Sequence, residues 1–177
     1  MVRCNGKVVL NGEIVPNNIK NLILDIDNCA LDSREWEKYI PADNSRAGWD
    51  NYHDHYYLVS ENCDMATFVY ELCRKGLERI YFITAREDIN NMREITINQL
   101  NDAFRGIRGW DKIKKYLYMR NTCDYSPTAE VKQNILHTHI MPNVFIDLAI
   151  DDDIRNVEMY RNNGIEAIHY TKYSTLD

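Results

Sequence analysis

Acidic residues stand in pairs after two short apolar runs that are far apart in the sequence. Asp25 and Asp27 lie at the end of one run, and Asp151 and Asp152 directly follow the other. Two carboxylates two positions apart can divide the work of nucleophile and proton donor, because their surroundings can push their pKa values apart. Carboxylate oxygens are also the ligands that Mg²⁺ prefers in proteins. The pairs therefore indicate metal-assisted chemistry, although each pair alone would equally suit a helix cap.

A hydroxyl and an ammonium complete a set that suits phosphoryl transfer. Thr84 follows the apolar residues 80–83, and Lys132 lies early in an expected helix. Phosphoryl transfer depends mostly on positioning and on neutralising charge. Both side chains can donate hydrogen bonds to phosphate oxygens, so we expect them to bind the phosphate of a substrate.

The first acidic pair would then carry the reaction. We expect Asp25 to attack phosphorus and to become an aspartyl-phosphate for a time. We expect Asp27 to protonate the leaving oxygen and then to deprotonate the water that hydrolyses the intermediate. Mg²⁺ would bind to Asp25, to the backbone carbonyl of Asp27 and to Asp151 or Asp152.

The order of these groups along the chain distinguishes two classes of protein. A bacterial receiver domain also combines an acidic pair, a phosphoaccepting Asp, a Thr or Ser and a Lys, but its acidic pair comes early. Here Asp25 and Asp27 come first and the pair Asp151-Asp152 comes last. The order excludes a receiver domain.

Strands and helices are expected to alternate along the chain. Apolar runs predict strands at 22–26, 80–83, 117–119, 144–150 and 165–170. Apolar residues three and four apart predict helices at about 64–75, 89–103, 128–140 and 154–163. We expect Asp64 to cap the first of these helices. The pattern predicts an α/β fold, a Rossmann-like parallel sheet flanked by helices, with ligands at the carboxyl ends of the strands.

Two segments lie outside this alternation, and we expect a single domain over residues 1–177. Within residues 1–18, the turn Asn11-Gly12 predicts a hairpin from Lys7 to Val15. Residues 33–62, the cap segment, are expected to form a small cap insertion after the first strand. Its aromatic residues could stack on a nucleobase or pack the cap against the sheet: Trp36, Tyr39, Trp49, Tyr52, Tyr56 and Tyr57. The run His53-Asp54-His55 suits surface or packing roles better than a second metal site.

The composition of the chain limits which binding partners and which cellular compartment we expect. The formal net charge is −6, whereas proteins that bind long nucleic acids usually have a basic face. We therefore expect a mononucleotide or a short nucleic-acid end as partner, and no extended duplex. No apolar run approaches the roughly 20 residues of a membrane span, and the five cysteines lack metal or disulfide spacing. The sequence is typical of a cytoplasmic protein, in the host cytoplasm if it is phage-encoded.

The order and spacing of the motifs resemble the haloacid dehalogenase superfamily of phosphatases. The four motifs of that superfamily are matched by Asp25-Ile26-Asp27, Thr84, Lys132 and Asp151-Asp152, within a resemblance that runs from Leu22 to Tyr170. The segments 117–132 and 148–165 resemble more closely the 3′-phosphatase domain of phage polynucleotide kinases and its stand-alone phage relatives. No Walker A loop occurs in the sequence, so the kinase activity of those proteins is not expected.

The resemblance implies further roles and also has one departure. It implies that Arg86 and Arg34 help to hold the substrate phosphate, although Arg34 would equally suit a surface position. It places Asp124 where the family has an acidic residue near the third motif. Where the family continues its first motif with Gly-Thr, this chain has Asn28-Cys29. Asn tolerates a left-handed backbone, whereas Cys29 lacks the hydroxyl that would support the loop.

The expected function is a Mg²⁺-dependent phosphomonoesterase that acts on a nucleotide or on a nucleic-acid 3′-phosphate end. One alternative is a phosphatase of another small phosphorylated metabolite, which the same residues would serve equally. A second alternative is a non-catalytic phosphate-binding protein that retains the fold, which the altered residues Asn28 and Cys29 suggest.

Overall fold

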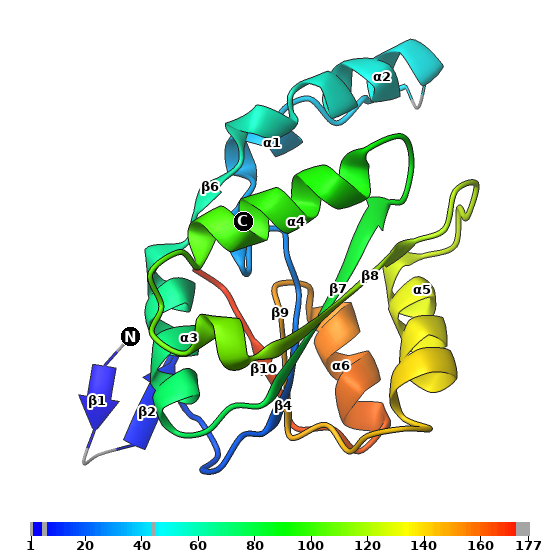
Figure 1. Cartoon of the computed structure of the whole chain (residues 1–177). Coiled ribbons are helices and arrows are strands. Elements are labelled where there is room, and N and C mark those ends of the chain that lie inside the picture. Colours follow the sequence, from blue (N-terminus) through cyan, green and yellow to red (C-terminus); the bar gives the residue numbers. More distant parts are fainter. Residues whose placement is uncertain (1, 5–6, 44, 173–177) are drawn as a thin grey trace.

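The computed structural model describes residues 2–4, 7–43 and 45–172 of the chain. At its centre lies a parallel sheet with the strand order β10-β9-β4-β7-β8 (Figure 1). Its strands, in chain order, are β4 (Asn21–Leu24), β7 (Arg79–Glu87), β8 (Lys114–Arg120), β9 (Leu148–Asp151) and β10 (Ala167–His169). Every pairing between neighbours is parallel. The predicted α/β fold with a Rossmann-like sheet is confirmed.

Helices cover both faces of this sheet. Successive residues of a strand point to opposite sides, so the apolar strands present an apolar face on each side for helices to cover. Leu22 and Leu24 of β4 pack in the core with α3 (Cys63–Arg74) and α4 (Met92–Ala103). Ile23, between them, packs in a second core with η3 (Leu136–Ile140) and α6 (Ile154–Asn162). The helix α5 (Thr128–Ile135) runs directly into η3 and contacts α6. A short 3₁₀ turn, η2 (Trp110–Lys112), precedes β8.

The structure shifts several predicted boundaries. The strand predicted at 144–150 begins only at Leu148, since Phe145 is 76% exposed and so lies outside the buried sheet. The helix predicted from Ile89 begins at Met92. The strand predicted at 80–83 continues to Glu87, with a change of register after Ile83. Thr84 and Arg86 therefore lie within a strand rather than after it.

The start of α3 is a further correction. Asp64 was expected to cap this helix, but Asn62 is the N-cap, and its side chain accepts a hydrogen bond from the Met65 N–H. Asp64 lies in the first turn, where its charge favours the helix dipole. Both residues are good N-caps by type, so local sequence did not separate them.

The N-terminal strands form a separate antiparallel sheet of β1 (Val2–Cys4), β2 (Lys7–Leu10) and β3 (Glu13–Ile14). Asn11 and Gly12 both have positive φ, 51° and 82°, as the tightest hairpin turn requires. The predicted hairpin is confirmed by the pairing of β2 with β3. The Asn11 side chain donates a hydrogen bond to the His169 carbonyl, which ties the turn to the end of β10.

The cap segment leaves and rejoins the main fold through two short strands. β5 (Leu31–Asp32) pairs with β6 (Ser60–Glu61) in an antiparallel sheet. Between them lie α1 (Arg34–Glu37), α2 (Arg46–Asp54) and the 3₁₀ turn η1 (Tyr56–Leu58), seen above the sheet in Figure 1. Trp36 is buried and stacks on Tyr52 at a centroid distance of 4.4 Å. Tyr57, by contrast, is 64% exposed, so the aromatic residues of the segment divide between packing and solvent.

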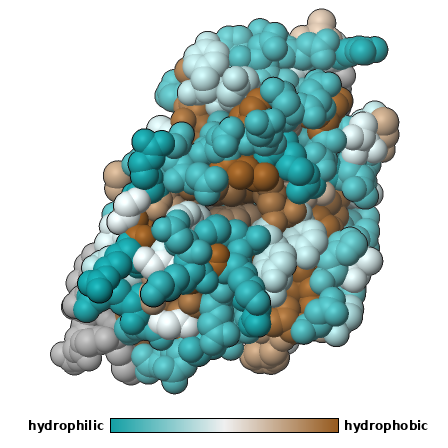
Figure 2. Space-filling model, in the orientation of Figure 1, coloured by the Kyte–Doolittle hydropathy of each residue, from teal (hydrophilic) through white to brown (hydrophobic). Residues whose placement is uncertain are grey.

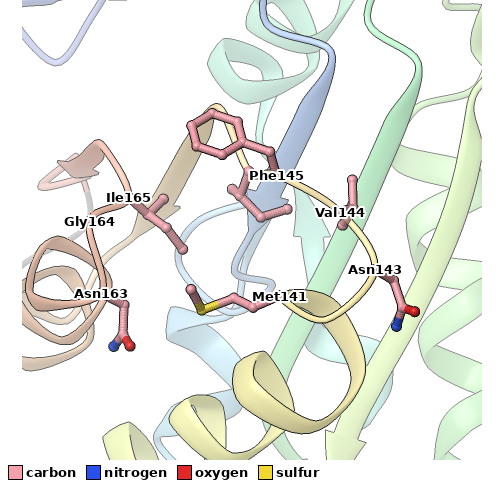
Figure 3. Close-up of a pocket in the computed structure, with 8 residues that line it drawn as sticks. Met141, Asn143, Val144, Phe145, Asn163, Gly164 and Ile165 are labelled. Atoms are coloured by element: carbon pink, nitrogen blue, oxygen red, sulfur yellow. The ribbon is translucent and has the colours of Figure 1, made fainter.

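The surface is mainly hydrophilic in Figure 2, with hydrophobic side chains gathered across the middle of that view. A hollow of about 360 Å³ lies at the amino ends of β9 and β10, and Figure 3 shows Met141, Phe145 and Ile165 around it. It is therefore at the opposite edge of the sheet from the carboxyl ends of the strands. Within the described ranges, no helix has both the length and the apolar character of a membrane span.

Candidate active site

The two acidic pairs meet where the order of the parallel strands reverses. The chain goes from β4 to β7 on one side, whereas β9 lies on the other side of β4. Asp25 directly follows β4, and its N–H donates to the Ile150 carbonyl of β9 at 3.0 Å. Asp151 is the last residue of β9. Ligands of open α/β sheets bind at such a switch point, so the fold itself brings these carboxylates together.

Lys132 links the two strand ends. Its Nζ donates to Asp25 Oδ1 at 2.5 Å and to Asp151 Oδ2 at 2.7 Å, and its side chain is only 2% exposed. Burial alone would lower the pKa of Lys132, but the charges of Asp151 and Asp25 raise it well above its usual range. The lysine is therefore a fixed positive charge. We refer to Asp25, Asp151, Asp152 and Lys132 as the lysine cluster.

The lysine cluster holds more carboxylates than one ammonium can balance. One oxygen from each of Asp25, Asp151 and Asp152 lies within 4.8 Å of the others. Burial, and then the charge of Asp151, raises the pKa of Asp152 to about 7. Burial also raises the pKa of Asp25 well above its usual value, against the effect of Lys132. Like charges so close favour protonation or a bound cation, and a set of carboxylate oxygens suits Mg²⁺.

Asp27 lies in a second group, the arginine cluster, which it forms with Arg86, Ser33 and Thr84. Arg86 donates to both carboxylate oxygens of Asp27, with Nη2 to Oδ1 at 2.6 Å and Nε to Oδ2 at 2.9 Å. The Ser33 hydroxyl donates to Oδ1 at 2.5 Å, and the Thr84 hydroxyl lies 3.5 Å from Oδ2. Burial would raise the pKa of Asp27, but the charge and hydrogen bonds of Arg86 lower it.

Arg86 is itself held from several sides. Its Nη1 donates to Thr96 Oγ1 at 3.0 Å and to Gln99 Oε1 at 2.6 Å, both on α4. The guanidinium carbon lies 4.7 Å from the ring centre of Trp36. The side chain is 3% exposed. Arg86 thus contacts the cap segment, α4 and Asp27 at the same time.

The loop after Asp27 accommodates the departure from the family motif. Asn28 has φ 53°, so it takes the left-handed conformation that Gly would supply. Cys29 is fully buried, and burial, followed by the charge of Asp25, raises the pKa of its thiol well above the usual value. Asn62 Nδ2 donates to the Cys29 carbonyl at 2.6 Å. The side-chain amide of Asn62, the N-cap of α3, therefore braces the loop that lacks the hydroxyl.

Other predicted residues are not brought to the clusters. Arg34 is 53% exposed and pairs with Asp32 at 2.7 Å. Asp124 accepts from the Ser126 N–H, and its backbone carbonyl accepts from Arg120. His55 stacks on Tyr39; neither His53 nor His55 belongs to the one group of possible metal ligands among the described residues. Sequence reasoning missed Ser33 and Gln99, since no local pattern distinguishes them.

Parallel strands, helices on both faces and acidic pairs around a buried lysine at the switch point define a phosphatase of the haloacid dehalogenase type. The family model described as the polynucleotide kinase PNKP phosphatase domain matches residues 20–172. The chain belongs to this family. A comparison with curated protein sequences finds no match.

Solved structures share the fold. A chain of the Pnkp1/Rnl/Hen1 RNA repair complex is 16% identical, with a TM-score of 0.56 over 88% of this chain and 44% of that one. A second Pnkp1/Rnl/Hen1 structure gives 18% identity and a TM-score of 0.58 over 91% and 49%. This chain thus spans under half the length of both. A haloacid dehalogenase-like hydrolase from Streptococcus pneumoniae is 12% identical, with a TM-score of 0.53 over 85% and 84%.

Proposed function

We propose that the chain is a Mg²⁺-dependent phosphomonoesterase that acts through an aspartyl-phosphate on Asp25. The observation that carries the proposal is the lysine cluster, in which one ammonium faces three carboxylates within 4.8 Å. With Asp27 and Arg86 included, four carboxylates stand against two cations, a net charge of −2 if all are ionised. A phosphate dianion would be repelled from such a site unless a divalent cation were also bound.

The donor set fits that cation. Asp25, the backbone carbonyl of Asp27, and Asp151 or Asp152 would hold Mg²⁺, since all offer the hard oxygen ligands that it prefers. When bound, Mg²⁺ neutralises charge that develops on the transferring phosphoryl group. The raised pKa of Asp152, about 7, supports this assignment because a nearby cation would let the carboxylate ionise.

The chain's own groups carry the two chemical steps. Lys132 holds Asp25 Oδ1, so we assign the attack to Oδ2. A bond forms from Oδ2 to phosphorus while the bond from phosphorus to the leaving oxygen breaks, and Asp27, which starts the cycle protonated against the pKa-lowering charge of Arg86, gives that oxygen its proton. Asp27 then takes a proton from water, which attacks phosphorus, and the bond to Oδ2 breaks to release inorganic phosphate. The free carboxylate of Asp25 is thereby restored.

Two donors are proposed to bind the phosphate oxygens, the Thr84 hydroxyl and the Lys132 ammonium. Arg86 was expected to join them. Its contacts with Asp27, Thr96 and Gln99 favour a different role, in which it orients Asp27. The exposed pairing of Arg34 with Asp32 favours the surface position over phosphate binding.

The proposed substrate is a nucleotide or a nucleic-acid 3′-phosphate end. Membership of a polynucleotide kinase phosphatase family supports it, as does the likeness to chains of an RNA repair complex. The exposed ring of Tyr57 offers a stacking face in the cap segment. The net charge of −6 favours a short end over a long duplex. The second candidate is a small phosphorylated metabolite, since the same catalytic groups would serve it.

The first test is the release of inorganic phosphate from an aryl phosphate, with Mg²⁺ and with excess chelator. The wild type should be active only with Mg²⁺, and Asp25→Asn should lower kcat/KM by at least about 10⁴-fold, as loss of a nucleophile does elsewhere. Equal rates for the wild type and Asp25→Asn would contradict the assignment of Asp25 as the nucleophile. A panel of a 3′-phosphorylated oligonucleotide, a 5′-mononucleotide and a sugar phosphate then separates the two substrate classes by kcat/KM.

A further inference from the structure

Ser33 occupies the N-cap position of α1 without capping it. Its side chain makes no cap hydrogen bond to the helix. The hydroxyl donates instead to Asp27 Oδ1 at 2.5 Å, and the residue is fully buried. A serine at an N-cap normally accepts from a backbone N–H of the first turn. The first N–H of this four-residue helix, that of Arg34, donates to Asp32 Oδ1 at 3.3 Å.

Asn28 contacts both ends of α1. Its Oδ1 accepts from the Ser33 N–H at 3.3 Å, and its Nδ2 donates to Glu37 Oε1 at 2.7 Å. Ser33 precedes the helix and Glu37 is its last residue. An isolated helix of this length is not stable in water, so these two contacts help to set where α1 lies. Asn28 also adjoins Asp27 in the chain and is itself buried.

We propose that Asn28 is a positioning residue, which fixes both ends of α1 and so holds the Ser33 hydroxyl against the Asp27 carboxylate. Glycine would give the same left-handed backbone but neither contact. The side chain thus adds a link between the catalytic loop and the cap segment. The inference rests on the proposed function, in which Asp27 donates a proton to the leaving oxygen.

The leaving group of the substrate makes the role measurable. An alkyl phosphate has a poor leaving group that needs a proton from Asp27, whereas a nitrophenyl phosphate leaves as a stable anion. In kcat/KM, which includes only the steps up to departure of the leaving group, a residue that orients Asp27 should therefore matter for the alkyl substrate and little for the aryl substrate. A residue that only stabilises the fold would change both rates by the same factor.

The experiment compares kcat/KM for both substrates in wild type, Asn28→Gly, Ser33→Ala and the double variant, with Mg²⁺ present, because kcat/KM excludes the later hydrolysis of the aspartyl-phosphate that both substrates share. Asn28→Gly keeps the positive φ and should lower kcat/KM about tenfold for the alkyl phosphate and less than about twofold for the aryl phosphate. Ser33→Ala should give the same pattern. If Asn28 acts through Ser33, the double variant should be no slower than Ser33→Ala, since coupled residues are not additive.

A second pair of variants tests the contact between Asn28 and Glu37 without a glycine at position 28. Asn28→Asp keeps the acceptor for the Ser33 N–H but sets a carboxylate against Glu37, so the alkyl rate should fall. In the double variant with Glu37→Gln, the Gln amide can donate to the Asp carboxylate, so the hydrogen bond returns with donor and acceptor exchanged. The alkyl rate of this double variant should therefore lie close to that of Glu37→Gln alone.

Equal losses on both substrates, or losses that multiply in the Asn28→Gly Ser33→Ala variant, would overturn the positioning role and leave the proposed function standing. A wild type that is inactive on both substrates and on the oligonucleotide, mononucleotide and sugar phosphate panel, or an Asp25→Asn variant with wild-type rates, would overturn the proposed function and this inference with it. Unfolding midpoints of all variants are measured alongside, so that every kcat/KM refers to folded protein.

Discussion

Two neighbouring groups of charged side chains lie at the same edge of the sheet and are balanced differently. In the lysine cluster one ammonium faces three carboxylates, and the pKa of Asp152 rises to about 7. In the arginine cluster one guanidinium serves one carboxylate, and the pKa of Asp27 falls. The ratio of negative to positive charges differs between the two groups. The lysine cluster holds three carboxylates for one ammonium, whereas the arginine cluster pairs one carboxylate with one guanidinium.

Loss of the Lys132 ammonium should disrupt the lysine cluster and have the largest effect on stability and activity. Lys132→Met leaves Asp25 and Asp151 buried without their counter-charge, which costs about 3–5 kcal/mol of unfolding free energy in comparable cases. The kcat should fall by about 10²–10³-fold, as with loss of one preorganised donor. Chemical denaturation and phosphate release measure the two effects. Lys38→Met, at a lysine that is 63% exposed, is the matched control and should change neither.

Loss of the guanidinium should disturb the arginine cluster less. Asp27 is 25% exposed, so in Arg86→Gln water can replace part of the lost pairing. We expect a loss of about 1–3 kcal/mol in unfolding free energy and a fall in kcat of about 10–100-fold with KM little changed. A variant with a raised KM and an unchanged kcat would show that Arg86 binds the substrate phosphate, as the family resemblance implies.

The response of stability to pH should also distinguish the clusters. A carboxyl whose pKa rises on folding binds more protons when folded, so its contribution to stability falls as the pH rises. For Asp152 the fall should run from about pH 3.8, its reference pKa, to about pH 7 in metal-free protein. Thermal unfolding in chelator should then give a steeper decline for wild type than for Asp152→Asn. Mg²⁺ should raise the wild-type midpoint most near pH 7 and above, and identical profiles for the two proteins would contradict this account.

Removal of a charge outside both clusters should have the smallest effect. Arg34 pairs with Asp32 at an exposed position, where such pairs contribute up to about 1 kcal/mol. Arg34→Ala should therefore keep kcat/KM within about twofold and barely move the unfolding midpoint. A rise of about tenfold in KM, measured by phosphate release, would return Arg34 to the phosphate site.

Local sequence sufficed for the sheet and for most of the clusters, because both depend on short-range patterns. Apolar runs predicted β4 and β9, and the residues next to their carboxyl ends met as the topology of a parallel sheet requires. Ser33 and Trp36 reach the arginine cluster from the cap segment, and Gln99 reaches it from α4. Their roles depend on tertiary packing, which leaves no periodic signal. For the same reason the sequence predicted both Arg86 and Asp27 at the site but not their pairing with each other.

The cap segment enters and leaves the main fold through β5 and β6, where Leu31 pairs with Glu61 and Asp32 with Ser60. The two ends of the insertion are therefore side by side, so its length and composition can change while the sheet keeps its register. Contacts such as those of Trp36 with Arg86 and of Ser33 with Asp27 join the insertion to the arginine cluster. The arrangement suits recombination, since a different insertion joined at β5 and β6 would leave the sheet and the side chains at its carboxyl edge in place.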